Sequence, residues 1–101
     1  MVNEIVKNRW AVVGFDYDTA RQLISNIEIS SGKEILRRKQ TKYELCTYFA
    51  DGTTLKWVQA AESSRGHKCG KMWCDKNINK DIFACVIMPM YFGKREEIVW
   101  L

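Results

Sequence analysis

The fold is decided by the middle of the chain, where residues 43–58 read YELCTYFADGTTLKWV. The side chains before and after Asp51-Gly52 alternate with a period of two, which is the period of a β-strand. Leu45 and Phe49 then share one face, and Tyr48 lies on the other. Asp-Gly between two such runs is a strong hairpin signal, because both central residues of a type I′ turn need positive φ. We therefore predict an antiparallel hairpin over residues 43–58.

A strand, a turn and a helix are predicted before this hairpin. The apolar run Ala11–Phe15 indicates a short strand. Asp18 or Thr19 can then accept hydrogen bonds from the first free N–H groups of a helix, whose apolar residues recur at helical spacing. The stretch Ser30–Gly32 ends this helix.

After the hairpin, we predict a loop over residues 60–70, a strand over Met72–Cys74 and a helix from about Asn79 to Met88, which Pro89 ends. Glu97–Leu101 can add a terminal strand. The predicted fold class is therefore α+β (mixed α/β). We expect one domain over residues 1–101, built as a small sandwich with a central β-sheet, the hairpin at 43–58 and two helices.

Length and composition limit the classes of protein. With 101 residues, of which 47% are hydrophobic, the chain can bury one core but not two. It contains no run of the roughly 18 apolar residues that a membrane helix needs, and Met1–Glu4 lacks the charged and apolar regions of a signal peptide. We therefore expect a cytoplasmic protein without a membrane partner, whose cysteines are reduced thiols or metal ligands.

The positive charge is concentrated in the middle of the chain. The formal net charge is +4, and residues 33–76 hold ten lysines and arginines against five acids. Such asymmetry favours an anionic partner, either nucleic acid or an acidic protein face. The alternative is a solvated basic surface without a partner.

The preferred contact surface is the basic loop that precedes the strand Met72–Cys74. Its two glycines let a partner approach the backbone closely, and its side chains can contact phosphate or carboxylate. The predicted contact residues are Arg65, His67, Lys68 and Lys71.

A second basic cluster, Arg37-Arg38-Lys39 with Lys42, lies just before the hairpin. Tyr43 and Tyr48 are near enough in sequence to stack on the bases of a bound single strand. The alternative role of this cluster is to protect an exposed sheet edge, because cations discourage pairing between sheets.

Four short motifs follow one another in the second half of the chain: the turn Phe49–Leu55, the loop Ser64-Arg65-Gly66, the strand Met72–Cys74 with Asp75 at its end, and the helix 82–88 before Pro89. Their order resembles the C-terminal half of the ATPase core of phage terminase large subunits, a RecA-like family. The resemblance implies a phage-type protein, and it places Asp75 where the family holds magnesium.

The chain departs from this family at the nucleotide site. It lacks the glycine-rich loop with a Lys-Ser/Thr pair that cradles the phosphates. Lys76 stands where the family has the glutamate that activates water, and a cation cannot act as a general base. We therefore expect neither ATP hydrolysis nor a cofactor, and we expect Asp75 to be a structural or binding residue.

A zinc site is the alternative role for His67, Cys69, Cys74 and Cys85, because zinc prefers thiolate and imidazole ligands. Their spacing does not form pairs of short knuckles, and apolar neighbours favour buried thiols, so no metal site is predicted. A nucleophilic pair of Cys69 and His67 is a further alternative, but no third residue is evident that would orient the base.

Two functions remain open at this point. The first is a non-enzymatic phage-type protein that binds a phage protein, or that inhibits a host defence protein as anti-CRISPR proteins do. It follows from a degraded nucleotide site with no catalytic group in its place. The second is a basic accessory protein that binds nucleic acid in phage DNA metabolism or packaging. Trp100-Leu101 is the predicted contact of a homo-oligomer.

Overall fold

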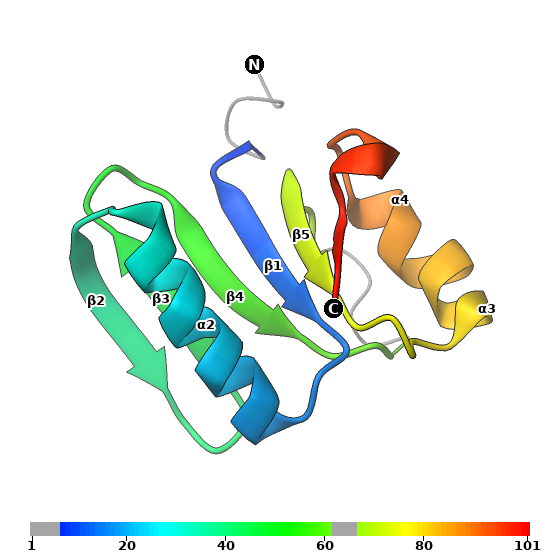
Figure 1. Cartoon of the computed structure of the whole chain (residues 1–101), viewed down its shortest axis with the longest axis horizontal. Helices are drawn as coiled ribbons and strands as arrows, with labels where there is room; N and C mark the ends of the chain where they lie inside the picture. Colours follow the sequence, from blue (N-terminus) through cyan, green and yellow to red (C-terminus); the bar gives the residue numbers. More distant parts are fainter. Residues whose placement is uncertain (1–6, 62–66) are drawn as a thin grey trace.

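The structure is a computed structural model that describes residues 7–61 and 67–101, and in these residues a mixed six-stranded β-sheet forms the centre of a single domain (Figure 1). The strands are β1 Arg9–Val13, β2 Ile35–Gln40, β3 Leu45–Phe49, β4 Thr54–Val58, β5 Lys71–Cys74 and β6 Val99–Trp100. Their order across the sheet is β2-β3-β4-β1-β5-β6. β1 is parallel to β4 and β5, and β5 is parallel to β6, whereas β3 is antiparallel to β2 and β4. The predicted α+β class is confirmed.

Helix α2, Tyr17–Ser31, covers the face of the sheet that we call the front face (Figure 1). Its buried residues Ala20, Ile24 and Ile27 belong to the same hydrophobic cluster as Val12 of β1 and Leu55 of β4. Successive side chains of a strand point to opposite faces of the sheet. The strand residues next to Val12 and Leu55 therefore point to the other face, which we call the rear face.

The second helical segment consists of α3, Lys80–Ile82, a π-helical turn, Phe83–Ile87, and α4, Met88–Met90. Its buried Val86 and Ile87 form one cluster with Ala11, Met72 and Cys74, which point to the rear. The two helical segments therefore lie on opposite faces and toward opposite ends of the sheet (Figure 1). In the described part of the chain, no helix covers the rear of β2, β3 and the first part of β4, or the front of β5 and β6.

The predicted hairpin is present, but its turn differs from the prediction. Cys46 lies opposite Lys56 in the antiparallel pair of β3 and β4. Gly52 has φ +93°, and no described non-glycine residue has positive φ, which excludes a type I′ turn with Asp51 at its centre. The N–H of Gly52 donates to the Phe49 carbonyl at 3.1 Å, and the N–H of Phe49 donates to the Thr53 carbonyl at 2.9 Å. The connection is therefore a three-residue loop with glycine at its left-handed position.

Helix α2 begins earlier than predicted. Asp16, rather than Asp18 or Thr19, is the N-cap, and its carboxylate accepts a hydrogen bond from the N–H of Thr19 at 3.2 Å. The predicted C-terminal end is confirmed, since Gly32 follows the helix with φ +67° in the left-handed region that favours glycine.

Pro89 does not end the second helical segment, which continues to Met90. In the preceding π-helical turn, the N–H of Met88 donates to the Phe83 carbonyl, five residues earlier. This wider turn accommodates a residue that has no N–H and whose ring would clash with the carbonyl of a regular helical turn.

The terminal strand is shorter than the predicted range of 97–101. A 3-10 turn, Arg95–Glu97, precedes β6, which consists of Val99 and Trp100. β2 was not predicted at all, because its sequence ILRRKQ has one apolar pair followed by four polar residues.

Candidate functional site

The rear of β2, β3 and β4 carries a basic surface. Paired residues of neighbouring strands point to the same side of a sheet, so the register places Arg37 beside Tyr48 and Lys39 beside Cys46. On the other side of β3, Lys56 lies beside Cys46. These side chains point away from α2, which packs on the alternate residues of the same strands.

A pocket of about 240 Å³, the rear pocket, opens on this surface. Ala11, Cys46 and Val58 are buried and give it an apolar floor. Tyr48 stands at its side toward β2, where the Arg37 guanidinium lies 4.6 Å from the centre of the ring. An apolar floor bounded by an aromatic ring is suited to a flat organic group.

Basic side chains surround the rear pocket. Arg9 comes from the start of β1, Lys56 from β4, and His67 and Lys68 from the segment before β5. Together with Arg37 and Lys39 of β2 they form what we call the basic half-face: Arg9, Arg37, Lys39, Lys56, His67 and Lys68.

Glu44 is the one carboxylate among the described residues that line the rear pocket. It forms an ion pair with Lys39, with Nζ and Oε2 3.0 Å apart. The hydrogen bond from Lys39 is the main cause that lowers the pKa of Glu44, and the charge of Lys56 lowers it further. The described residues offer no ion-pair partner to Arg9, Lys56 or Lys68. The rear pocket therefore keeps a net positive charge.

The surroundings of His67 favour its neutral imidazole. Although the side chain is largely exposed, partial desolvation lowers its pKa below the ordinary value for histidine, and the nearby Lys56 lowers it further. An anion bound between the two residues would act in the opposite direction and favour the protonated imidazole.

The structure divides the predicted basic loop between the two faces of the sheet. His67 and Lys68 lie at the rear pocket. Lys71 is the first residue of β5 and points to the front, where its Nζ lies 4.7 Å from the centre of the Trp10 ring and 5.1 Å from that of Trp73. The predicted contact residue Arg65 lies outside the described residues.

The second predicted cluster is divided in the same way. Arg37 and Lys39 lie on the rear face, but Arg38 points to the front and pairs with Glu28 of α2, with Nη2 and Oε1 3.0 Å apart. Glu28 is buried and also accepts a hydrogen bond from the Thr47 hydroxyl. Arg38 thus connects β2 to α2 and is not available to the rear pocket.

Asp75 lies at the carboxyl end of β5 and does not line the rear pocket. Its N–H donates to the Val13 carbonyl at 3.0 Å, and its carboxylate accepts from the N–H of Asn77 at 2.9 Å. Gly14, after β1, is so close that a Cβ at this position would be 3.3 Å from the Cβ of Asp75. These contacts give Asp75 a structural role in the turn after β5.

The cysteines and His67 do not form the alternative zinc site. In the described residues, no group of three or more His, Cys, Asp or Glu side chains could hold a metal ion. Cys69 and Cys74 are buried whereas Cys85 is exposed. Burial raises the pKa of Cys69 to about 12, so this thiol is protonated at neutral pH and the alternative nucleophilic pair with His67 is not supported.

Two basic residues of the rear pocket, Arg9 and Lys56, are not among the predicted contact residues. The signal for Lys56 was its alternation with Leu55 and Trp57, which places it on the other face of the same strand. No signal indicated Arg9, because only the pairing of β1 with β4 brings it beside Thr54.

The chain matches no known protein-family model, and no curated protein sequence or solved structure is detectably similar to it. None of the helices in residues 7–61 and 67–101 combines the length and the hydrophobicity of a membrane-spanning segment.

Proposed function

We propose that this protein binds nucleic acid with the basic half-face. The observation that supports the proposal is the position of Lys56. Cations on an edge strand such as β2 can be explained by protection of that edge, but β4 is an inner strand of the sheet. Lys56 is half-buried there and has no ion-pair partner among the described residues. A phosphate is the partner that would compensate its charge.

The spread of the cations favours a polymer over a small anion. They come from β2, β4 and β1, and β3 lies between β2 and β4. At about 4.8 Å between neighbouring strands, this row spans roughly 15 Å. Such a distance corresponds to several phosphates in a row, which is how a nucleic-acid backbone presents its charge.

Fluorescence anisotropy with labelled oligonucleotides at several salt concentrations tests this proposal. We expect affinity to fall steeply with salt, because each neutralised phosphate releases a counterion. Lys56→Gln should reduce the slope of log affinity against log salt by about 0.7 to 0.9, the contribution of one phosphate contact. Arg21→Gln is the matched control, because Arg21 is an exposed cation on α2 at the front. Binding that does not respond to salt, or equal effects of the two variants, would refute the proposal.

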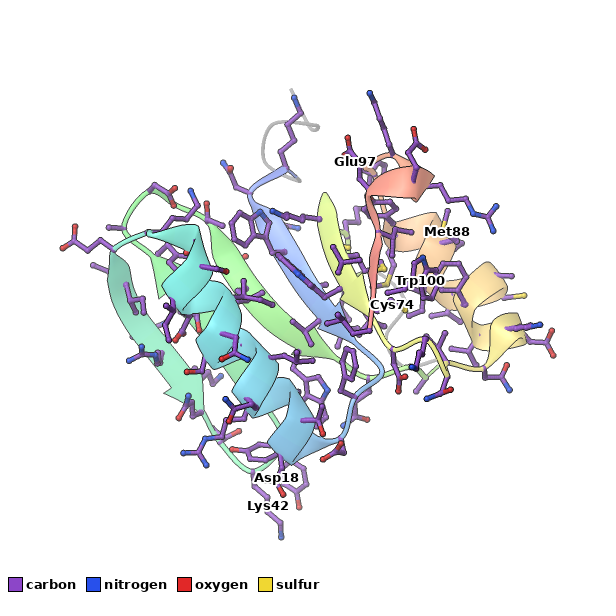
Figure 2. The ribbon with its side chains drawn as sticks, in the orientation of Figure 1. Asp18, Lys42, Cys74, Met88, Glu97 and Trp100 are labelled. Atoms are coloured by element: carbon purple, nitrogen blue, oxygen red, sulfur yellow. The ribbon has the colours of Figure 1, made fainter. Side chains whose placement is uncertain are left out.

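A second function, binding to a protein, is favoured by the opposite edge of the sheet. β6 is an edge strand, and Val99, Trp100 and Leu101 are 37%, 45% and 43% exposed. One side of the Trp100 ring packs against Phe83, with ring centres 4.9 Å apart, beside the C-terminal helical segment (Figure 2). An exposed edge with apolar side chains suits a partner that adds a strand.

The first protein partner to test at this edge is a second copy of the chain. If two β6 edges pair, sedimentation should show a dimer whose population rises with concentration, and Trp100→Lys should abolish it. Ile29→Lys is the matched control, because Ile29 is 78% exposed but lies on α2. A monomer at all concentrations would leave a phage or host protein, including a defence protein, as the partner for this edge.

A further inference from the structure

We propose that the rear pocket takes one unpaired nucleobase, so that the basic half-face binds single strands in preference to duplexes. This inference rests on the proposed function and names its ligand. It is carried by the combination of an apolar floor, an aromatic wall and a cationic rim within one pocket of about 240 Å³. A purely electrostatic surface would need only the cations.

The aromatic wall is held in place. Tyr48 lies in β3, which pairs on both sides, with Arg37 of β2 opposite it on one side and Thr54 of β4 on the other. The Arg37 guanidinium packs on the ring at 4.6 Å from the side of β2. The side of the ring toward β4 and β1 is therefore the side that faces the pocket, and a base there would stack on a ring that is already fixed.

A polar side chain beside the floor can contact the edge of a base. Thr54 lines the rear pocket on the strand next to Tyr48 and points to the same face. Its hydroxyl can donate and accept hydrogen bonds, so it can pair with the ring N–H or a carbonyl of thymine. Phosphates on either side of the inserted base would then reach Lys56 and the cations at the two ends of the half-face.

A duplex cannot use these features. Its bases are paired and stacked, and their edges are reached only by a protein element that enters a groove. The rear pocket is a hollow in a sheet face, and its described lining comes from the strands and the segment before β5, not from an element that projects into a groove. A duplex would contact the cations alone, and it would bind more weakly because the apolar floor and Tyr48 would remain unused.

The test compares a labelled oligothymidine of about 12 nucleotides with a labelled hairpin duplex of similar length at the same salt concentration. We expect the single strand to bind at least about tenfold more tightly, the difference that one base–aromatic stack provides. Tyr48→Leu should remove this difference by weakening the single strand only, with an unchanged salt slope. Tyr48→Phe should keep it, because the ring is retained.

A second measurement does not depend on any variant. 2-Aminopurine is a fluorescent base analogue whose emission changes when it stacks on an aromatic side chain. In a single strand that contains 2-aminopurine, the emission from one position should therefore change on binding to the wild-type protein. Salt-sensitive binding with equal affinity for the duplex, or with no change in 2-aminopurine emission, would overturn this inference while leaving the proposed function standing. Absence of salt-sensitive binding to both probes would overturn the two together.

Discussion

Arg38 and Glu28 form an ion pair that connects the edge strand β2 to helix α2 on the front of the sheet, with Nη2 and Oε1 3.0 Å apart. The next residue toward the N-terminus, Arg37, points to the rear and packs on Tyr48. Neighbouring arginines of one strand therefore serve two faces of the sheet. Because the Glu28 carboxylate is buried and Arg37 is exposed, the two arginines should differ in what they contribute to stability and to binding.

Substitution of each arginine by methionine separates these roles. Arg38→Met should lower the free energy of unfolding by about 1–3 kcal/mol, because it leaves a buried carboxylate without its cation, although Arg38 itself is half exposed. Arg37→Met should change stability by less than about 1 kcal/mol, since it loses one exposed contact with an aromatic ring. In contrast, Arg37→Met should weaken nucleic-acid binding and Arg38→Met should not. Urea unfolding and anisotropy check both, and the reverse pattern would contradict the assignment of faces.

Glu44 is predicted to restrain the affinity of the rear pocket for anions. Glu44→Gln removes the one carboxylate of the described lining and releases Lys39 from its ion pair. We expect affinity for a single strand to rise a few-fold at low salt, with a steeper salt dependence by about one phosphate contact. Glu34→Gln is the control, because Glu34 is exposed and lies before β2, outside the rear pocket. An unchanged salt slope in Glu44→Gln would mean that Lys39 does not contact phosphate.

His67 should make stability and binding depend on pH in opposite directions. Its pKa is lowered in the folded protein by partial desolvation and by Lys56, so the folded chain takes up a proton less readily than the unfolded chain. The contribution of His67 to stability is therefore fully present above its ordinary pKa of about 6.5, and it is lost progressively as the pH falls below that value and through the lower pKa of the folded state. A bound phosphate favours the imidazolium, so affinity for nucleic acid should instead increase from about pH 7 to about pH 5.

His67→Gln should flatten both of these pH profiles. The other charged or titratable side chains that line the rear pocket are Arg9, Glu44, Cys46, Tyr48, Lys56, Lys68 and Cys69. The pKa of Glu44 is lowered and that of Cys69 is raised to about 12, so neither titrates in this range. Unfolding and anisotropy measurements across the range provide the check. A pH-dependent affinity that persists in His67→Gln would assign the effect to another group.

The four cysteines should differ strongly in reactivity toward a thiol reagent. Cys69 and Cys74 are buried, and burial raises the pKa of each to about 12, while Cys46 is also buried. Cys85 is exposed. The native protein should therefore react rapidly at one thiol and at all four only after unfolding. Cys85→Ser should remove the rapid phase, and a rapid phase that survives would show that a buried cysteine becomes accessible in the native state.

The elements with a clear period are present where they were predicted, although the hairpin turn and the start of α2 differ from the prediction. The hairpin of β3 and β4 and the helix α2 have strong alternation or helical spacing, and Leu45 and Phe49, which were predicted to share a face, pack in one cluster with α2. β2 was missed because its polar residues lie on an edge strand, where only one side packs against another strand. The prediction that Pro89 ends the second helical segment was wrong for a different reason. Nothing in the sequence indicates that the preceding turn widens and so accommodates the proline.

The candidate site could be predicted only in part. His67, Lys68, Arg37 and Lys39 were selected because cations cluster in the sequence around them. However, residues that are neighbours in the sequence do not all lie on the same face of the sheet. Side chains alternate along a strand, so Arg38 points to the front while Arg37 and Lys39 point to the rear. Lys56 and Arg9 come to the rear pocket through the pairing of β4 with β3 and β1, which depends on contacts between residues far apart in the chain.

Gly14 and Gly52 provide a matched test of the contact between the turn after β1 and Asp75. Both glycines have nearly the same φ, +92° and +93°, so alanine at either position costs about 1–2 kcal/mol of backbone strain. At Gly52 an added Cβ meets no atom within 4 Å, whereas at Gly14 it would lie 3.3 Å from the Cβ of Asp75. Gly14→Ala should therefore lower the free energy of unfolding more than Gly52→Ala, by up to about 1 kcal/mol.

The same pair distinguishes the two places at which a ligand could bind. If the rear pocket is the binding site, both alanine variants should keep the affinity of the wild-type protein for a single strand, because neither glycine lines that pocket. If Asp75 and the carboxyl ends of β1 and β5 took part instead, Gly14→Ala would displace Asp75 and weaken binding while Gly52→Ala would not. Anisotropy on the two folded variants at one salt concentration separates these outcomes, and a selective loss in Gly14→Ala would move the site from the rear face to this edge of the sheet.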